Sequence, residues 1–258
     1  MIPFALMHVG CLGVFWVGWD TTAFIVCVSL YLVRMFAITG FYHRYFCHRA
    51  FKTSRVFQFI MGLIGASAVQ RGPLWWAAHH RHHHRHSDGP EDLHSPHVHG
   101  IAWSHMGWFT SRQAYKTNLK EVPDLAKYPE LIWIDKYELF MPVVLAGTLF
   151  AIGGWPWLIW GFFVSTVALF HGTCTINSLS HLMGRRRYDT GDESRNSFIL
   201  ALVTLGEGWH NNHHHFPGSA RQGFRWWEID ITYYGLCVLS WVGIIRQLRP
   251  VPENVLNE

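Results

Sequence analysis

Long stretches of this sequence carry no charged side chain, and they constrain the fold more than any other feature. No Asp, Glu, Lys or Arg occurs from Ile2 to Trp19 or from Leu139 to Gly184, and Arg34 is the only one between Ala23 and Gly40. Such runs suit a hydrocarbon core about 30 Å thick, which roughly 20 helical residues cross. Half of the 258 residues are apolar and only 15% are charged. We therefore predict an all-α integral membrane protein.

Breaks within the uncharged runs predict four transmembrane helices, at residues 2–19, 23–40, 139–153 and 156–176. Polar residues at 20–22 separate the first two spans, and Gly153-Gly154-Trp155-Pro156 separates the last two. We expect the Arg34 side chain to extend to the lipid headgroups. The apolar stretches 56–69 and 231–245 have about 15 residues, too few for comfortable spans. We expect them to lie on the membrane or to cap its cytoplasmic half, although the second leaves a fifth span open.

The distribution of Lys and Arg predicts the orientation. The two tight turns carry none, whereas segments 41–138 and 184–258 hold nearly all of them. The positive-inside rule therefore predicts that both segments and both termini are cytoplasmic. We expect one membrane domain spanning 1–258, in the inner or plasma membrane if the source is bacterial. The five cysteines form no CxxC pair and are interpreted as small buried hydrophobic residues without disulfides.

Histidine is unusually frequent, with 19 residues, ten of them between His79 and His105. Three groups fall in the predicted cytoplasmic segments, at 43–48, 79–86 and 210–214. Residues three and four apart share one face of an α-helix, so an HxxHH spacing aims three imidazoles at one point and predicts a metal site. In the second group, His79/His82/His83 and His80/His83/His84 both fit this spacing.

The first group has a different spacing, because His43 and His48 are five residues apart. On a regular helix this separates the side chains by roughly 140°. Each could serve one of two metals, or the helix could end between them. Neutral imidazole suits iron, zinc, copper or nickel, so spacing does not name the metal. The absence of HExxH disfavours a zinc protease of that type.

These groups resemble the histidine boxes of the membrane fatty acyl desaturases of the Δ9 type, especially bacterial members related to stearoyl-CoA desaturase. The similarity runs through HRYFCHR, WWAAHHRHHHRHSD and TLGEGWHNNHHHFPGSARQGFRWWEID, and covers most of the chain from Arg34 to Asp230. The resemblance implies four spans with a cytoplasmic helical cap that carries a histidine-rich dimetal site.

The resemblance also implies the ligands. The family pattern HRxHH selects His80, His83 and His84, and leaves His79, His82 and His86 as supporting or surface residues. An NSxxH pattern implies that Asn177 holds a metal through water and that His181 binds directly. The implied ligand set is His43, His48, His80, His83, His84, His181, His210, His213 and His214, with Asn177.

The implied reaction is oxygen-dependent desaturation of a fatty acyl chain, giving a cis double bond. It requires two non-haem Fe ions, O2 and two external electrons. The substrate is expected to be an acyl-CoA or an acyl-lipid. Because no fused electron-transfer domain or flavin motif is present, a separate ferredoxin, rubredoxin or cytochrome b5 is expected to supply electrons. No nucleic-acid partner is expected.

Other residues receive weaker assignments. Carboxylates at Asp88, Asp92, Asp192 and Glu207 could accept imidazole N–H bonds, although solvated loop acids are an equal alternative, and Glu207 is favoured because it lies within the third box. Gln70 and Trp76 resemble residues near the bend of the family's acyl channel. Five cations could receive substrate phosphates or simply follow the positive-inside pattern: Arg71, Arg81, Arg185, Arg186 and Arg187. The remaining histidines are not expected to bind metal: His8, His94, His97, His99, His105, His171 and His215.

Two alternatives remain open. The boxes do not separate a desaturase from an acyl-chain hydroxylase or acetylenase with the same centre. A histidine-rich membrane metal transporter is a more remote alternative, because it predicts metal-binding residues along the spans and not in one cytoplasmic block.

Overall fold

The computed structural model describes residues 2–258, which are mostly helical. The one sheet in this range pairs β1 (Lys52–Thr53) antiparallel with β2 (Ile245–Arg246). Two helical stretches are long and apolar enough to cross a membrane. They are Thr21–Cys47, with a mean hydropathy of 2.0, and Phe140–His181, with a mean hydropathy of 1.6.

The first stretch consists of α3 (Thr21–Phe36), which continues directly into the π-helix η1 (Ala37–Cys47). Asp20 begins it, because its carboxylate accepts a hydrogen bond from the backbone N–H of Ala23 at 2.7 Å. This cap satisfies one of the free N–H groups of the first turn. The predicted break at residues 20–22 is therefore the start of the helix.

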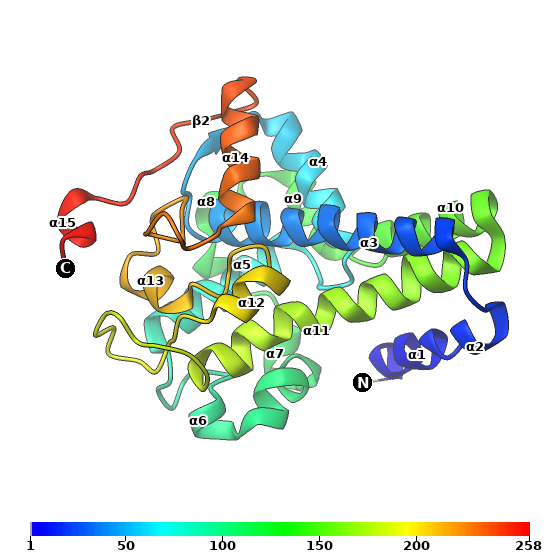
Figure 1. Ribbon diagram of the computed structural model, residues 1–258, viewed down its shortest axis with the longest axis horizontal. Helices are drawn as coiled ribbons and strands as arrows, with labels where there is room; N and C mark the ends of the chain where they lie inside the picture. The colour runs from blue at the N-terminus through cyan, green and yellow to red at the C-terminus, as the bar shows by residue number, and fades with distance from the viewer. Residues whose placement is uncertain (1) are drawn as a thin grey trace.

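The second stretch is a helical hairpin. Its segments are α10 (Phe140–Trp157), η5 (Leu158–Val164), α11 (Ser165–Ser178) and η6 (Leu179–His181). Gly154 has φ 60° and ψ −152°, a conformation that essentially only glycine adopts. The chain reverses there, and η5 packs back against α10 before α11 continues away from the turn (Figure 1). The two arms correspond to the predicted spans 139–153 and 156–176.

The predicted span at 2–19 is not one continuous helix. It is divided into α1 (Ile2–Cys11) and α2 (Val14–Val17), which lie beside the hairpin (Figure 1). Gly10 and Gly13 allow close packing, because a Cβ atom at either position would collide with Phe163 or Ile159 of η5. Glycine is also a poor helix former, which explains a break here despite the uncharged sequence.

The two shorter apolar stretches form α4 (Arg55–Ala66) and α14 (Ile231–Trp241), of 12 and 11 residues. In Figure 1, α14 stands steeply on the long helix formed by α3 and η1, and it is joined to η1 where the Thr39 and Thr232 hydroxyls lie 2.7 Å apart. Eleven residues do not cross a bilayer, which needs roughly 20. A fifth span at α14 is therefore not supported.

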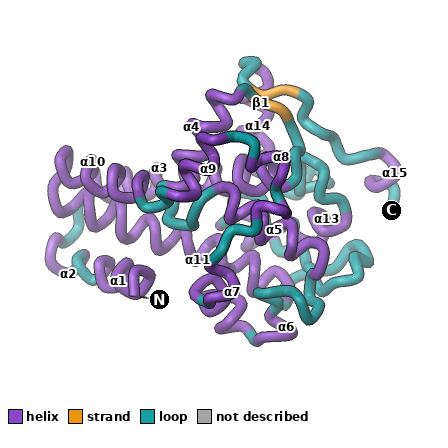
Figure 2. Tube along the Cα trace, turned by 180° about the vertical axis from the view of Figure 1, so that it is seen from behind, coloured by secondary structure: helices purple, strands orange, loops and turns teal. Residues whose placement is uncertain are grey.

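The remaining helices cover one end of the long ones. Figure 1 places α5 (Pro73–His86), α12 (Phe198–Val203) and α13 (His210–His215) together at this end, away from the hairpin turn at Gly154, and Figure 2 shows α5 and α13 there from behind. The smaller elements are α6 (Pro96–His99), η2 (Trp103–Gly107), η3 (Trp108–Thr110), α7 (Arg112–Tyr115), η4 (Leu119–Glu121), α8 (Pro123–Ala126), α9 (Pro129–Lys136) and α15 (Glu253–Leu256). All five cysteines are free.

Arg34 does not extend toward the headgroups as expected. Its side chain is 1% exposed and donates to the carbonyl oxygens of Leu30 and Ser67. It also donates to the hydroxyls of Ser165 and Thr166 at 2.6 and 2.8 Å. The prediction was wrong because hydroxyl groups from another part of the chain, which spacing does not reveal, give the guanidinium enough partners to remain buried.

Candidate metal centre

The first histidine pair lies on the π-helix η1. A π-helix closes i to i+5 hydrogen bonds and has a wider turn than an α-helix, so residues five apart approach one face. His43 lies within η1 and His48 caps it, and their ring centroids are only 5.0 Å apart. The 140° separation expected for a regular helix therefore does not apply.

The second group lies on α5, where His80, His83 and His84 share one face. Arg81 points the other way and donates to the carbonyl oxygens of Phe46 and Cys47 at the end of η1. It also donates to the Asp124 carboxylate at 2.7 Å. Arg81 thus fixes α5 against η1. This contact explains why an arginine follows His80, the first histidine of the HRxHH pattern.

The other histidines of α5 lie outside this face. His79 packs against Trp75 and Trp108. His82 approaches the carbonyl oxygen of Glu91, and His86 lies 3.8 Å from the Glu91 carboxylate.

The third group lies on α13, and its asparagines hold the helix in place. The Asn211 side chain accepts from the backbone N–H groups of Arg187 and Tyr188. The Asn212 amide donates to the carbonyl oxygen of Gln222 and to the Glu228 carboxylate, both at 2.9 Å. These contacts leave His210, His213 and His214 to face α5, η1 and η6, whereas His215 stacks on Tyr188.

The predicted ligands gather into two adjacent clusters, in each of which the possible ligand atoms lie within 4.8 Å of one another. The five-histidine cluster consists of His43, His48, His80, His84 and His213. The four-histidine cluster consists of His83, His181, His210 and His214. Helices α5 and α13 contribute to both, and the stacked rings of His84 and His214, 4.5 Å apart, join them.

Distances within the clusters suit shared metal ions. Neighbouring Nε2 atoms are 2.8 to 3.0 Å apart across the His48–His80, His80–His84, His84–His213, His43–His213 and His181–His210 pairs. Two nitrogens about 2.1 Å from one ion and at right angles are about 3.0 Å apart. A ring nitrogen carries either one hydrogen or one lone pair. Three of these Nε2 atoms, those of His80, His84 and His213, each lie close to two other Nε2 atoms. Hydrogen bonding therefore cannot account for all of these contacts.

Carboxylates orient four of the rings. Asp88 lies 2.8 Å from Nδ1 of His181, Asp92 lies 3.0 Å from that of His83, and Asp192 lies 2.6 Å from that of His214. Glu207 contacts Nδ1 of His43 and is also held by Arg44. An Nδ1–H that donates to a carboxylate leaves the Nε2 lone pair free for a metal.

The protonation states agree with this arrangement. Burial alone would raise the pKa of the Asp88, Asp92 and Asp192 carboxyls, but contacts with imidazole outweigh it and hold each pKa below its usual range. Burial lowers the pKa of the imidazoles of His48, His80, His84, His210 and His213 well below the usual value. These rings are therefore neutral at pH 7, which is the form that binds metals.

Unpaired nitrogens provide a further test of the fit. Nε2 of His214 and Nδ1 of His210 are buried without a hydrogen-bond partner. Buried polar atoms are rarely left unpaired, and each such case calls for a missing partner. A set of ligands that contains only imidazoles and no thiolate suits iron, zinc or copper.

Two cavities meet at the clusters. A small one of about 40 Å³ is lined by His43, His80, His83, His210, Asn177 and Glu207, among others. A larger one of about 620 Å³ shares Trp76, His80, Thr173 and Asn177 with it. The larger volume is within the range of ligand pockets, which is roughly 300–1,000 Å³.

The predicted channel residues both line the large cavity. Trp76 stacks on His80 with ring centroids 5.1 Å apart, and Gln70 donates to the Thr173 hydroxyl at 3.0 Å. Apolar side chains of α1, α10, η5 and α11 line much of the remainder, including Phe4, Val143, Phe162 and Phe170. A long apolar ligand that enters here would pass directly beside the histidines.

Several histidines that the sequence treats as isolated support the centre. His94 packs on the ring of His83 at 4.4 Å, and together with Asp92 and His83 it forms a third set of possible metal ligands. His97 contacts the carbonyl oxygen of His181, and His99 contacts that of Asp92. Sequence spacing missed these roles because the loop brings the residues back to α5 without helical periodicity.

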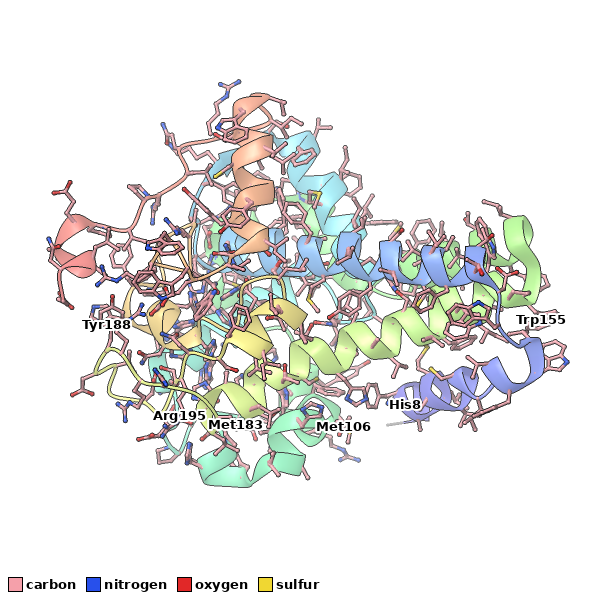
Figure 3. The ribbon with its side chains drawn as sticks, viewed as in Figure 1. His8, Met106, Trp155, Met183, Tyr188 and Arg195 are labelled. Carbon is pink, nitrogen blue, oxygen red and sulfur yellow. The ribbon has the colours of Figure 1, made fainter. Side chains whose placement is uncertain are left out.

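A second group of isolated histidines forms a hydrogen-bonded chain. His8, labelled in Figure 3, points from α1 toward α11, with its Nε2 atom 2.9 Å from that of His171. His171 in turn contacts His105 at 3.0 Å. No sequence signal links these three positions, which are far apart in the chain.

The five cations that could receive substrate phosphates or simply follow the positive-inside pattern have different surroundings. Arg186 pairs with Asp189 and Glu193, and Arg187 pairs with Glu228. Among the five, only Arg71 lines the large cavity, where it donates to Glu138 at 2.9 Å.

Comparisons with known proteins agree with the geometry. A family model described as fatty acid desaturase matches residues 20–235. The chain is 38% identical over 218 residues to an sn-2 palmitoyl-lipid 9-desaturase of Nostoc sp. (strain 36), an alignment that covers 83% of this chain and 76% of that protein. It is 37% identical over 254 residues to an acyl-CoA 5-desaturase of Anemone leveillei, covering 96% and 78%.

A third relative extends the range of products. A palmitoyl-monogalactosyldiacylglycerol delta-7 desaturase of Arabidopsis thaliana is 36% identical over 228 residues, covering 87% of this chain and 61% of that protein. Proteins similar to this chain are thus named for double bonds at positions 5, 7 and 9, and for both acyl-CoA and acyl-lipid substrates.

Proposed function

This chain belongs to the fatty acid desaturase family, and we propose that it inserts a cis double bond into a fatty acyl chain, at position 9, at a two-iron centre held by the two histidine clusters. The position follows the 9-desaturases among its relatives, which include cyanobacterial sn-1 and sn-2 acyl-lipid enzymes. The double-bond position and the metal are parts of the proposal.

One observation carries the proposal most directly. Nine imidazoles from η1, α5, η6 and α13 converge as two neighbouring sets, and four of them are oriented by carboxylates. Structural hydrogen bonding alone does not require nine imidazoles to converge in this way. The arrangement supports one ion in each cluster, with Asn177 bound to the nearby ion through water.

Two iron ions bound there would supply the activation of O2 that removing hydrogen from an unactivated methylene requires. The chain's own residues position the substrate. The walls of the large cavity hold the acyl chain, and Trp76 and Gln70 direct it past His80 toward the small cavity. The buried setting of the clusters keeps bulk water away from the reacting carbons.

We also propose a membrane topology. The α1–α2 segment, α3 with η1, α10, and η5 with α11 are the four spans, and the helices that carry the clusters form a cap on the cytoplasmic side with both termini. The support is the placement of nearly all Lys and Arg outside the hairpin and α3, together with the gathering of α5, α12 and α13 at one end (Figure 1).

The partners are proposed on chemical grounds. The substrate is an acyl-CoA or an acyl-lipid, as in the relatives, and Arg71 at the large cavity is placed to receive its polar end. A separate ferredoxin, rubredoxin or cytochrome b5 delivers the electrons to the cytoplasmic cap. Hydroxylation would use the same centre, so product analysis distinguishes it.

Expression in a desaturase-deficient host, with fatty acids profiled by mass spectrometry, tests the proposal. We expect new monoenes from the wild type and none from His83→Ala, which removes a member of the four-histidine cluster. His86→Ala is the matched control on the same helix, outside both clusters, and should retain the product. Hydroxylated products, or monoenes that persist in His83→Ala, would contradict it.

A further inference from the structure

The entrance of the large cavity can be located from the exposure of the residues that line it. Nearly all of the side chains around this cavity of about 620 Å³ are buried or half-buried. Tyr115, Leu139 and Val143 are the exceptions, with exposed fractions of 64%, 61% and 69%. A side chain that lines a cavity and is also exposed marks the place where the cavity meets the outside. The entrance therefore lies between α7, which ends at Tyr115, and the start of α10.

In the proposed topology this entrance lies at the depth of the lipid headgroups. Glu138, which also lines the cavity, is the last charged residue before the uncharged run from Leu139 to Gly184. Charged side chains are costly in the hydrocarbon core and stay at its boundary. Val143 lies one turn into α10, on the apolar side of this boundary. One edge of the entrance thus borders the headgroups, and the other borders the hydrocarbon of the cytoplasmic leaflet.

The apolar edge of the entrance faces lipid. Phe140 and Val144, beside Val143 on α10, are 50% and 42% exposed. On a spanning helix, exposed apolar side chains of this kind contact the acyl chains of the bilayer. Behind this edge the cavity is lined by α1, α10 and the span of η5 with α11, through residues such as Phe4 and Phe170. A lipid tail can therefore pass from the bilayer into the cavity and stay in an apolar environment throughout.

The polar edge suits the uncharged ester region of a lipid. Arg71 and Glu138 are the only Lys, Arg, Asp or Glu side chains among the described residues that line the cavity, and they pair with each other at 2.9 Å. The guanidinium also lies over the rings of Trp75 and Tyr115, 5.2 and 4.5 Å from their centres. Coenzyme A carries several phosphate groups, which need several cations that are free to pair. The paired Arg71 has only its remaining N–H groups to offer, and ester oxygens are acceptors that suit them.

Building on the proposed desaturase function, we propose that the substrate is a glycerolipid of the cytoplasmic leaflet whose acyl chain enters the large cavity sideways, between Tyr115 and Val143. The headgroup stays at the bilayer surface, with the glycerol esters beside Arg71 and Glu138. The acyl chain lies in the cavity and reaches His80, which lines it. Similar proteins are named for both acyl-lipid and acyl-CoA substrates, so similarity alone does not make this choice.

Photolabelling of the purified protein in lipid nanodiscs tests the route. One probe is a phosphatidylcholine with a photoreactive diazirine in its acyl chain, and the other is an acyl-CoA with the same chain. Labelled residues are located by mass spectrometry. We expect the phosphatidylcholine to label Phe170 and Thr173, which line the cavity, and the acyl-CoA to label them much less.

A variant of the entrance shows whether the lipid passes through it. Val143→Trp obstructs the entrance and should remove most of the labelling of Phe170 and Thr173 by the phosphatidylcholine. Val144→Trp is the matched control, because Val144 is the next residue on α10, is exposed and does not line the cavity. This control should be labelled like the wild type. If Val143→Trp does not accumulate, Leu139→Trp makes the same comparison with Phe140→Trp as its control.

The outcomes separate this proposal from the proposed function. Cavity labelling by the acyl-CoA that equals or exceeds labelling by the phosphatidylcholine overturns the glycerolipid substrate. Equal labelling of an entrance variant and its control by the phosphatidylcholine overturns the sideways route. Photolabelling needs no turnover, so the expected labelling supports the lipid entrance even if the chain produces no monoenes, a result that contradicts only the proposed function.

Discussion

The carboxylates next to the histidines show how single side chains prepare the centre. Asp192 accepts from Nδ1 of His214 and is itself held by the Thr190 hydroxyl at 2.7 Å and the Ser194 backbone at 3.0 Å. The ring is thereby fixed in the tautomer that presents Nε2, and its burial lowers the His214 pKa to about 4. Such supporting carboxylates affect metal affinity although they do not touch the metal.

Asp192→Asn should weaken binding at the four-histidine cluster by about 10- to 100-fold. Equilibrium metal titration of the purified protein measures this. The matched control is Asp189→Asn in the same loop, because Asp189 is 95% exposed and contacts Arg186 and the backbone of Gly191 but no histidine among the described residues. Equal affinities in both variants would show that the carboxylate does not orient His214.

Arg44 follows the first ligand and has a structural role. Its guanidinium is 1% exposed and contacts Glu207 and Asp230, each at 2.9 Å. It also donates to the carbonyl oxygen of Ala220 at 2.8 Å. Removing it leaves two buried carboxylates without their cation.

Arg44→Met should lower the free energy of unfolding by about 3–5 kcal/mol, the usual effect of breaking a buried ion pair. Arg55→Met is the comparison, since Arg55 pairs with Glu130 at the exposed surface, and it should change stability little. Thermal unfolding in detergent, followed by tryptophan fluorescence, measures both. Similar midpoints for the two variants would refute the role given to Arg44.

At the scale of elements, helical spacing predicted some parts of the site and not others. The HxxHH patterns indicated the shared faces of α5 and α13, because i, i+3 and i+4 neighbours follow from local geometry alone. The π-helix η1 could not be predicted, because the wider turn that brings His43 to His48 has no spacing signature. The break between α1 and α2 was also missed, since hydropathy does not register Gly10 and Gly13.

The turn of the hairpin gives a prediction at this scale. Gly154→Ala should destabilise the protein by about 1–3 kcal/mol, because φ 60° with ψ −152° strains any residue with a Cβ atom. Gly147→Ala in the same helix is the control, because a Cβ atom there meets nothing within 4 Å. Alanine favours a helix, so this variant should be neutral or more stable in a thermal melt. A greater loss at Gly147 than at Gly154 would contradict the assignment of the turn.

For the whole molecule, composition predicted a helical membrane protein, and the structure is mostly helical with two helical stretches long and apolar enough to cross a membrane. The helices α5 and α13, which carry histidines of both clusters, lie at the same end of these stretches (Figure 1). Contacts between distant segments were beyond sequence reasoning. The pairing of His181 with Asp88, the burial of Arg34 among hydroxyls and the chain from His8 to His105 all depend on how separate helices pack. The large cavity likewise results from the combined placement of α1, α5, α10 and α11.

The proposed topology predicts labelling from opposite sides of the membrane. Trp155→Cys lies at the hairpin turn and should react with an impermeant maleimide in intact cells. Asp189→Cys lies on the cap and should react only after the membrane is permeabilised. Labelling of both in intact cells would contradict a cytoplasmic cap.

The central claim is that each histidine cluster holds one ion, and iron content per chain tests it most directly. Purified wild-type protein should contain two iron ions by mass spectrometry of the metal. His48→Ala, in the five-histidine cluster, and His210→Ala, in the four-histidine cluster, should each retain about one ion at equal folded protein. A wild type that binds a single ion or none, when supplied with iron, would contradict the account.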